Sequence, residues 1–140
     1  MGNTVCGVLS ADAVDHLKRR LRAEGVVTAY VFGSAARGEL GLLSDVDIAV
    51  LFDEHLSADE QHDRHLRLLG GLSAFFPGRQ VDVVNLADAT PALAFNAIKD
   101  GALLYSDDDA TRIRREARIV VTYLDIKPLL ERHAEDVLTR

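Results

Sequence analysis

The sequence predicts a mixed α+β (α/β mixed) fold, in which helices cover one face of a small mixed sheet and a helical segment ends the chain. Short runs rich in β-branched and aromatic residues alternate with longer stretches of helical periodicity. The first two strand-like runs are joined by a loop of about a dozen residues, whereas a helical stretch separates the second from the third, which favours a mixed sheet. The length of 140 residues predicts a single domain over residues 1–140, with the last helix, about 107–140, packing on it.

Each predicted helix carries a start or stop signal. Ser10 and Ser57 can cap the first two helices, and Gly25 can stop the first. Pro91 stands in the first turn of the third helix, where proline is favoured, whereas Pro128 should kink or break the last. In chain order, the patterns predict helices over residues 11–24, 58–76, 90–99 and 107–140, and strands over residues 26–32, 45–52, 80–86 and 102–106.

The second and third strands begin with polar residues. In DVDIAVLF, apolar side chains share one face, while the other face begins with Asp45 and Asp47. The third strand, QVDVVNL, has Asp82 at a similar place. The loop before the second strand starts with Gly33 and Ser34, where a short helix can begin.

Composition and charge exclude several classes of protein. Apolar residues make up 48% and charged residues 27% of the chain, which is typical of a globular protein. A net charge of −6 disfavours sequence-independent binding to free nucleic acid, although a local basic patch is compatible with it. The single cysteine, Cys6, cannot form an internal disulfide, and neither a signal peptide nor a membrane span is evident. We therefore expect a cytoplasmic protein that does not associate with membranes.

The paired aspartates indicate a divalent cation. Asp45 and Asp47 are two residues apart on a strand, so both side chains point the same way. Two carboxylates ~5 Å apart repel by roughly 3 kcal/mol at an effective dielectric of 20, and a cation between them reverses the sign. If the second and third strands are neighbours, Asp82 joins them. A ligand set of oxygens without His or Cys suits Mg²⁺ or Mn²⁺ better than Zn²⁺.

The glycine-serine turn complements these carboxylates. Gly33 lets the backbone approach a ligand closely, and Ser34 offers a hydroxyl and a helix-start N–H to an anion. Arg37 adds a guanidinium for phosphate oxygens. Each feature alone is more often an ordinary turn or a solvated charge. Together they predict a phosphate cradle facing a metal-binding carboxylate set, as phosphoryl or nucleotidyl transfer requires.

At these residues the chain resembles the minimal nucleotidyltransferase (MNT) family of the DNA polymerase β-like superfamily. The family pattern is Gly-Ser, ten residues, then Asp-x-Asp, and here it reads GSAARGELGLLSDVD over residues 33–47. The inner ARG and SD also match, VDVVNL resembles the third-carboxylate strand, and AIKDGALLYSDD resembles the closing stretch. The resemblance spans Tyr30 to about Asp108 and implies the polymerase β-like fold.

The resemblance also implies site residues. Asp45 and Asp47 would hold two Mg²⁺ ions, and Asp82 would hold the catalytic ion and help deprotonate the acceptor hydroxyl. The acceptor oxygen would attack the α-phosphorus of ATP in line, and pyrophosphate would leave. The nucleotide-binding residues would be Gly33, Ser34, Arg37 and Ser44.

Short members of this family resemble the antitoxins of HEPN/MNT toxin–antitoxin pairs, which implies AMP transfer from ATP to a tyrosine hydroxyl of a partner HEPN-type RNase toxin. Such a protein adenylyltransferase would form a hetero-oligomeric complex with its toxin. Two alternatives stay open: an antitoxin that acts by binding alone, and a nucleotidyltransferase that modifies a small molecule such as an aminoglycoside. The sequence gives neither the base preference nor the number of AMP units added.

Other polar residues have simpler interpretations. His62 and His65 could hold a metal, but a solvated helix face is favoured, and Tyr105 and Tyr123 are expected to pack. A basic cluster near the start of the last helix could dock a partner or RNA, although pairing with nearby acidic residues is favoured. This cluster consists of Arg112, Arg114, Arg115 and Arg118.

Overall fold

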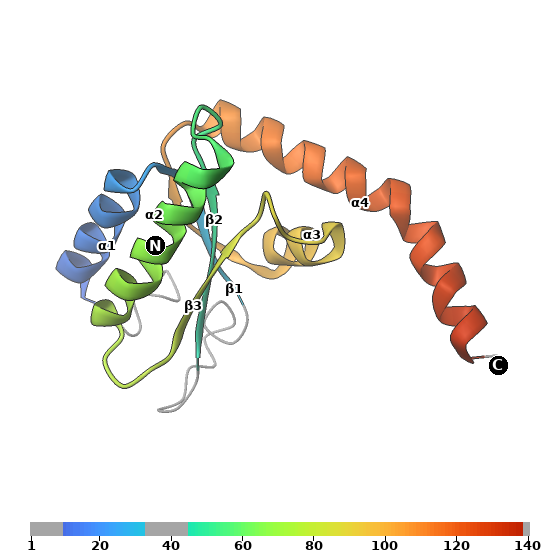
Figure 1. Cartoon of the computed structure of the whole chain (residues 1–140), viewed down its shortest axis with the longest axis horizontal. Coiled ribbons are helices and arrows are strands. Elements are labelled where there is room, and N and C mark those ends of the chain that lie inside the picture. Colours follow the sequence, from blue (N-terminus) through green and yellow to red (C-terminus); the bar gives the residue numbers. More distant parts are fainter. Residues whose placement is uncertain (1–9, 33–44, 139–140) are drawn as a thin grey trace.

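The computed structural model describes residues 10–32 and 45–138 (Figure 1). All eight predicted helices and strands are present, which confirms the mixed α+β fold class. Their order is α1 (Ala11–Ala23), β1 (Val26–Phe32), β2 (Val46–Phe52), α2 (Ala58–Leu72), the short 3₁₀ helix η2 (Ser73–Phe75), β3 (Val81–Asn85), α3 (Pro91–Asp100), β4 (Ala102–Ser106) and α4 (Asp109–Leu138).

The four strands form one mixed sheet in the order β3-β2-β1-β4. β1 pairs with β2 and with β4 in the antiparallel sense, and β2 pairs with β3 in the parallel sense. α2 provides the crossover that parallel neighbours need. This topology places the starts of β2 and β3 side by side at one edge of the sheet.

Both faces of the sheet are covered by helices, which corrects the expectation of helices on one face only. β2 explains the difference, because Ala49 and Leu51 on its second face are as completely buried as the residues on its first. A strand that is apolar on both faces needs cover on both. One core combines Val46, Ile48, Val50 and Phe52 with Leu17 and Leu21 of α1 and Leu68 and Leu72 of α2. The second core combines Tyr30, Ala49, Leu51 and Leu86 with Ala94 and Ala97 of α3 and Ile119 of α4.

The helix starts follow the predicted signals. The Ser10 hydroxyl accepts a hydrogen bond from the Ala13 N–H, and Ser57 forms a reciprocal capping box with Glu60. α1 gives way to β1 at Gly25, whose φ of 82° lies in the left-handed region that favours glycine.

Of the kink or break predicted at Pro128, the break does not occur, because α4 is continuous from Asp109 to Leu138 with Pro128 inside it. The ribbon of α4 instead bends downward in its later turns (Figure 1), as a proline within a helix explains. The first half of α4 packs on the body: Arg115 Nη1 donates to the Phe52 carbonyl at 2.8 Å, and Tyr123 stacks on Phe95 with ring centroids 4.2 Å apart. The second half projects away from the sheet (Figure 1).

None of the helices in the described part of the chain has the length and apolarity that crossing a membrane requires.

Candidate functional site

Three predicted carboxylates lie at the sheet edge where β2 and β3 begin. Asp47 and Asp82 are partners in the parallel ladder, so they face each other across neighbouring strands. Asp45 immediately precedes β2. Asp45 and Asp82 are exposed, whereas Asp47 is partly buried. The structure therefore brings Asp47 and Asp82 together and places Asp45 beside them.

The register that pairs the aspartates follows from the apolar residues beside them. Val46 and Val81 are ladder partners, and both are buried in the core under α1 and α2. The Val46 N–H donates to the Gln80 carbonyl at 2.9 Å, which holds the starts of the strands together. Because side chains alternate along a strand, Asp47 and Asp82 must then project from the opposite face. Shifting the register by one residue would bury charge in the first core.

The electrostatics of this edge centre on Asp47. Partial burial raises the pKa of the Asp47 carboxyl above its ordinary 3.8, and the negative charges of Asp82 and Asp45 raise it further. Burial and two like charges therefore oppose ionisation of Asp47 at this edge. Such an arrangement is typical of functional sites.

The donor set of this edge fits a magnesium ion. Mg²⁺ prefers oxygen ligands and is usually held by one or two carboxylates together with water and substrate phosphates, without an all-protein cage. No three His, Cys, Asp or Glu side chains within residues 10–32 and 45–138 gather closely enough to hold a metal ion by themselves. Asp47, Asp82 and Asp45 form an open edge whose mutual repulsion a divalent cation would relieve.

The predicted nucleotide-binding residues Gly33, Ser34, Arg37 and Ser44 lie outside the described residues. The described chain nevertheless fixes where that segment starts and ends. Phe32, the last residue of β1, is the ladder partner of Asp47. Asp45, immediately before β2, is the first described residue after the segment.

One polar network was missed by sequence reasoning. The buried Tyr30 donates its hydroxyl hydrogen to the Glu116 carboxylate, and Glu116 also accepts from Arg112 Nη1 at 3.2 Å. Burial, followed by the neighbouring carboxylate, raises the pKa of the Tyr30 phenol far above its ordinary 10.0. No sequence pattern links a tyrosine on β1 to residues on α4 more than 80 positions away, so only the fold could pair them.

The basic cluster on α4 is paired within the chain. Arg112 contacts Asp109 and Glu116. The other three guanidiniums surround the Glu54 carboxylate, at 3.6, 3.4 and 4.0 Å for Arg114, Arg115 and Arg118. Intramolecular pairing, the favoured interpretation, accounts for these contacts.

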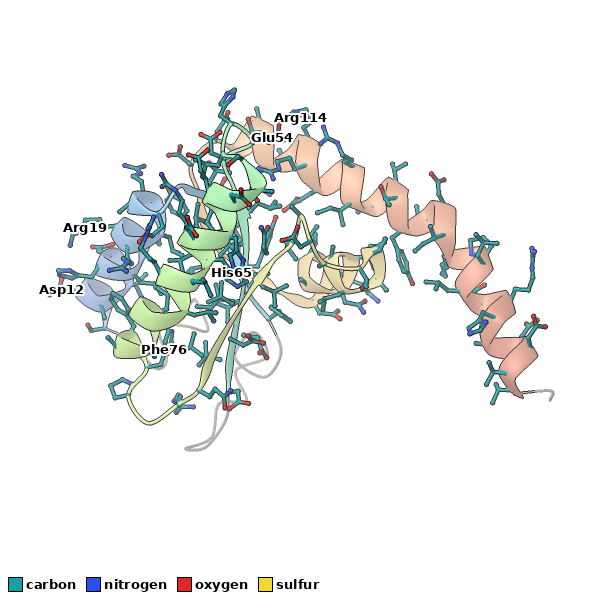
Figure 2. All side chains as sticks on the ribbon, in the orientation of Figure 1. Asp12, Arg19, Glu54, His65, Phe76 and Arg114 are labelled. Carbon is teal, nitrogen blue, oxygen red and sulfur yellow. The ribbon has the colours of Figure 1, made fainter. Side chains whose placement is uncertain are left out.

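His65, considered above as a metal ligand, has a structural role. His65 Nε2 lies 2.6 Å from the Val83 carbonyl oxygen and bonds α2 to β3. Figure 2 places His65 on the inner side of α2, turned toward the sheet.

A cavity of about 300 Å³, lined among others by Leu51, Leu86 and Pro91, lies at the ends of β2 and β3, whereas the carboxylates lie at the starts of these strands. This cavity is not part of the carboxylate edge.

Comparison with known proteins identifies related sequences and folds. The family model described as polymerase beta, nucleotidyltransferase matches residues 15–110. No curated protein matches the chain. Among solved structures, a chain of a toxin–antitoxin complex with AMP-PNP aligns with a TM-score of 0.69 and 22% identity, over 89% of this chain and 98% of that one. A chain from a complex of tri-AMPylated Shewanella oneidensis HEPN toxin with MNT antitoxin gives 0.65 and 20%, over 90% and 96%. At these identities the likeness shows the fold.

Proposed function

We propose, from the premise that the chain belongs to the polymerase β nucleotidyltransferase family, that it is a Mg²⁺-dependent protein adenylyltransferase acting as an antitoxin. It transfers AMP from ATP to a tyrosine hydroxyl of a partner HEPN-type RNase toxin and so silences the toxin. Residues 1–140 would form one domain. This domain would act in the cytoplasm, where ATP and the RNA that such a toxin cleaves are found.

The pairing of Asp47 with Asp82 in the β2–β3 ladder is the observation that carries this proposal. Neighbouring strands lie about 4.8 Å apart, so the two carboxylates can share ligands. Burial and like charge oppose ionisation of Asp47, and bound divalent cations would remove that opposition.

The residues of the edge have distinct proposed roles. Asp45, Asp47 and Asp82 would hold Mg²⁺, or Mn²⁺, which would neutralise charge on the attacking and leaving oxygens. Asp82 would accept the proton of the tyrosine hydroxyl. The tyrosine oxygen would form a bond to the α-phosphorus of ATP. The bond between that phosphorus and the oxygen that bridges to the β-phosphorus would break, and pyrophosphate would leave.

The segment between β1 and β2 would hold the nucleotide. Gly33 and Ser34 would bind the outer phosphates of ATP, with assistance from Arg37 and Ser44. Support comes from the register, because Phe32 at the start of this segment is opposite Asp47. A phosphate cradle formed by this segment would therefore begin opposite Asp47.

The acceptor is supported by the neighbours in fold. They include toxin–antitoxin complexes, one with AMP-PNP and one with a tri-AMPylated HEPN toxin. The exposed position of Asp82 is compatible with an acceptor as large as a protein. A partner that covers this open edge would also exclude water from it.

Mass spectrometry tests the proposal. The product of the gene next to that of this chain is taken as the candidate toxin, co-expressed with the chain, and weighed intact. Co-expression with wild type should add one or more AMP units to the toxin, and Asp45→Asn/Asp47→Asn should add none. Asp59→Asn/Asp63→Asn on the exposed face of α2 is a matched control that should transfer AMP as wild type does. An unmodified toxin that the wild-type chain still silences would indicate instead an antitoxin that acts by binding alone.

A further inference from the structure

The outer edge of β3 is bonded to α2 by two side chains. β3 is a strand of five residues at the edge of the sheet, and within the described chain it pairs only with β2. His65 Nε2 lies 2.6 Å from the Val83 carbonyl oxygen, and Asn85 Nδ2 donates to Gln61 Oε1 at 3.0 Å. We call these two hydrogen bonds the seam. A carbonyl oxygen can only accept, so His65 Nε2 carries the hydrogen of the first bond.

The spacing of the seam matches the two elements that it joins. Gln61 and His65 are four residues apart on α2, which is a rise of about 6 Å. Asn85 and Val83 are two residues apart on β3, which is a rise of about 6.6 Å. The order of the bonded pairs shows that the two elements run in opposite directions, as a crossover between parallel strands requires. Both bonds can therefore form along the free edge of β3 without distorting either element.

The backbone of β3 presents alternate residues to β2. The Gln80 carbonyl accepts from the Val46 N–H, so the backbone of Gln80 and of every second residue after it is directed toward β2. Asp82 is one of these residues, whereas the backbone of Val83 is directed toward the free edge. The chain is thus held from the inside at Asp82 by the ladder, and from the outside, one residue later, by His65.

The place of Asp82 makes it sensitive to this outer support. Asp82 is the second residue of β3, and the ends of elements open locally at low free-energy cost. An opening that reaches Asp82 would separate its carboxylate from that of its ladder partner, Asp47. It would also deprive the partly buried Val83 carbonyl of its donor, which opposes the opening. Figure 2 shows His65 turned from α2 toward the sheet, where it gives this support.

We propose that His65 is a positioning residue for Asp82. Its hydrogen bond to the Val83 carbonyl holds the start of β3 against α2 and keeps the Asp82 carboxylate where it shares a divalent cation with Asp47. The inference rests on the proposed function, which assigns both aspartates to a metal-binding edge. His65 acts through the backbone and does not touch the cation, because α2 covers the first core and Asp82 projects from the opposite face of the sheet.

The test removes one seam bond at a time. His65→Leu removes the donor at similar side-chain size, and His65→Gln restores it, because the glutamine Nε2 is as many bonds from Cα as the histidine Nε2. Gln61→Leu is the matched control, because it breaks the other seam bond, at Asn85, three residues after Asp82. Mn²⁺ is the probe, and electron paramagnetic resonance of free Mn²⁺ gives its dissociation constant from the full chain without ATP or toxin. Amide hydrogen exchange reports the opening of β3.

We expect His65→Leu to raise the Mn²⁺ dissociation constant roughly tenfold and to speed hydrogen exchange at the Asp82 amide. His65→Gln and Gln61→Leu should bind Mn²⁺ within about twofold of wild type. If His65→Leu does not fold, His65→Asn takes its place, because its amide is one bond too short to replace Nε2. Added to Asp82→Asn, the His65 change should weaken Mn²⁺ binding little further, because both changes act on the same ligand.

Three results would overturn the inference. The first is unchanged Mn²⁺ affinity in folded His65→Leu. The second is an equal loss of affinity in His65→Leu and Gln61→Leu, because a general loosening of β3 would then be the cause. The third is a loss that His65→Gln does not restore, or that is just as large in the Asp82→Asn background, because His65 would then act by another route.

The two proposals fail in different ways, because Mn²⁺ binding is measured without the toxin. A toxin that wild type leaves unmodified, together with weaker Mn²⁺ binding in His65→Leu alone, overturns AMP transfer and retains the positioning of Asp82. Transfer by wild type, together with unchanged Mn²⁺ binding in His65→Leu, overturns the positioning role alone. A wild-type chain that neither binds Mn²⁺ nor modifies the toxin overturns both.

Discussion

Asp47 on β2 and Asp82 on β3 face each other as partners in a parallel ladder, at the edge where both strands begin. Their backbones are held in register by buried valines on the other face. The proximity of the two carboxylates is therefore built into the sheet and does not depend on loop conformation.

Removing the Asp47 charge should stabilise the metal-free protein. Because the pKa of the Asp47 carboxyl is higher in the folded protein, the carboxyl takes up a proton more readily there. The resulting contribution to stability is complete below the ordinary pKa of 3.8 and is lost as pH rises through the higher folded-state pKa. Asp47→Asn should therefore gain up to ~1 kcal/mol relative to wild type at pH 7, a figure kept small by solvent screening. Urea unfolding in EDTA should show this gain shrinking toward pH 4. An equal difference at both pH values would exclude the electrostatic cause.

Magnesium should stabilise the wild-type fold. A ligand that binds only the folded state contributes roughly 1–3 kcal/mol at concentrations of about ten to a hundred times its dissociation constant. The melting temperature of wild type should therefore rise with added Mg²⁺, whereas that of Asp45→Asn/Asp47→Asn should not. Calcium serves as a comparison because its larger coordination sphere suits this open edge less. Equal shifts in wild type and variant would place the ion elsewhere.

The Tyr30–Glu116 hydrogen bond should stabilise the contact between β1 and α4. Tyr30→Phe should cost about 1–2 kcal/mol, because a partly buried carboxylate loses a donor while keeping Arg112. The raised phenol pKa gives a second readout. As pH rises through 10, the ultraviolet absorbance change of tyrosine ionisation should be the same in wild type and Tyr30→Phe while the protein stays folded. A larger change in wild type would show that Tyr30 titrates normally.

Two glycines should respond in opposite directions to alanine. Gly25→Ala puts a Cβ 2.8 Å from Leu56 Cδ1 on a backbone with φ of 82°, so we expect a loss of about 1–2 kcal/mol. Gly70 lies within α2, and nothing is within 4 Å of its added Cβ. Gly70→Ala should therefore stabilise the protein by roughly 0.5–1 kcal/mol. Thermal melts of the two variants measure both effects, and a shift in the same direction would contradict this account.

The carboxylate edge could be predicted largely from local pattern. Alternation along DVDIAVLF put Asp45 and Asp47 on one face, and VDVV offered Asp82 at a similar place. Whether Asp82 belonged with them depended on strand order, which a local pattern does not contain. The sheet resolved it by pairing β2 with β3.

The helices show the same division between local and long-range information. Capping by Ser10 and Ser57 depends on residues three positions apart, and the structure has both caps. At Pro128, where a kink or a break was expected, α4 continues and bends, because the loss of one backbone hydrogen bond bends a helix without necessarily ending it. The burial of Ala49 and Leu51 under α3 and α4 required the placement of elements more than 40 residues away.

By itself the sequence determined the elements, the family pattern and the types of side chain available for chemistry, because these depend on neighbours within one or two turns or strand repeats. Tertiary structure decided which strands are adjacent, that helices cover both faces, and that the Tyr30 hydroxyl meets Glu116. It also decided that the end of α4 has no cover from the described chain. These outcomes depend on long-range packing, in which each apolar face must find a partner, and no local pattern specifies which partner it finds.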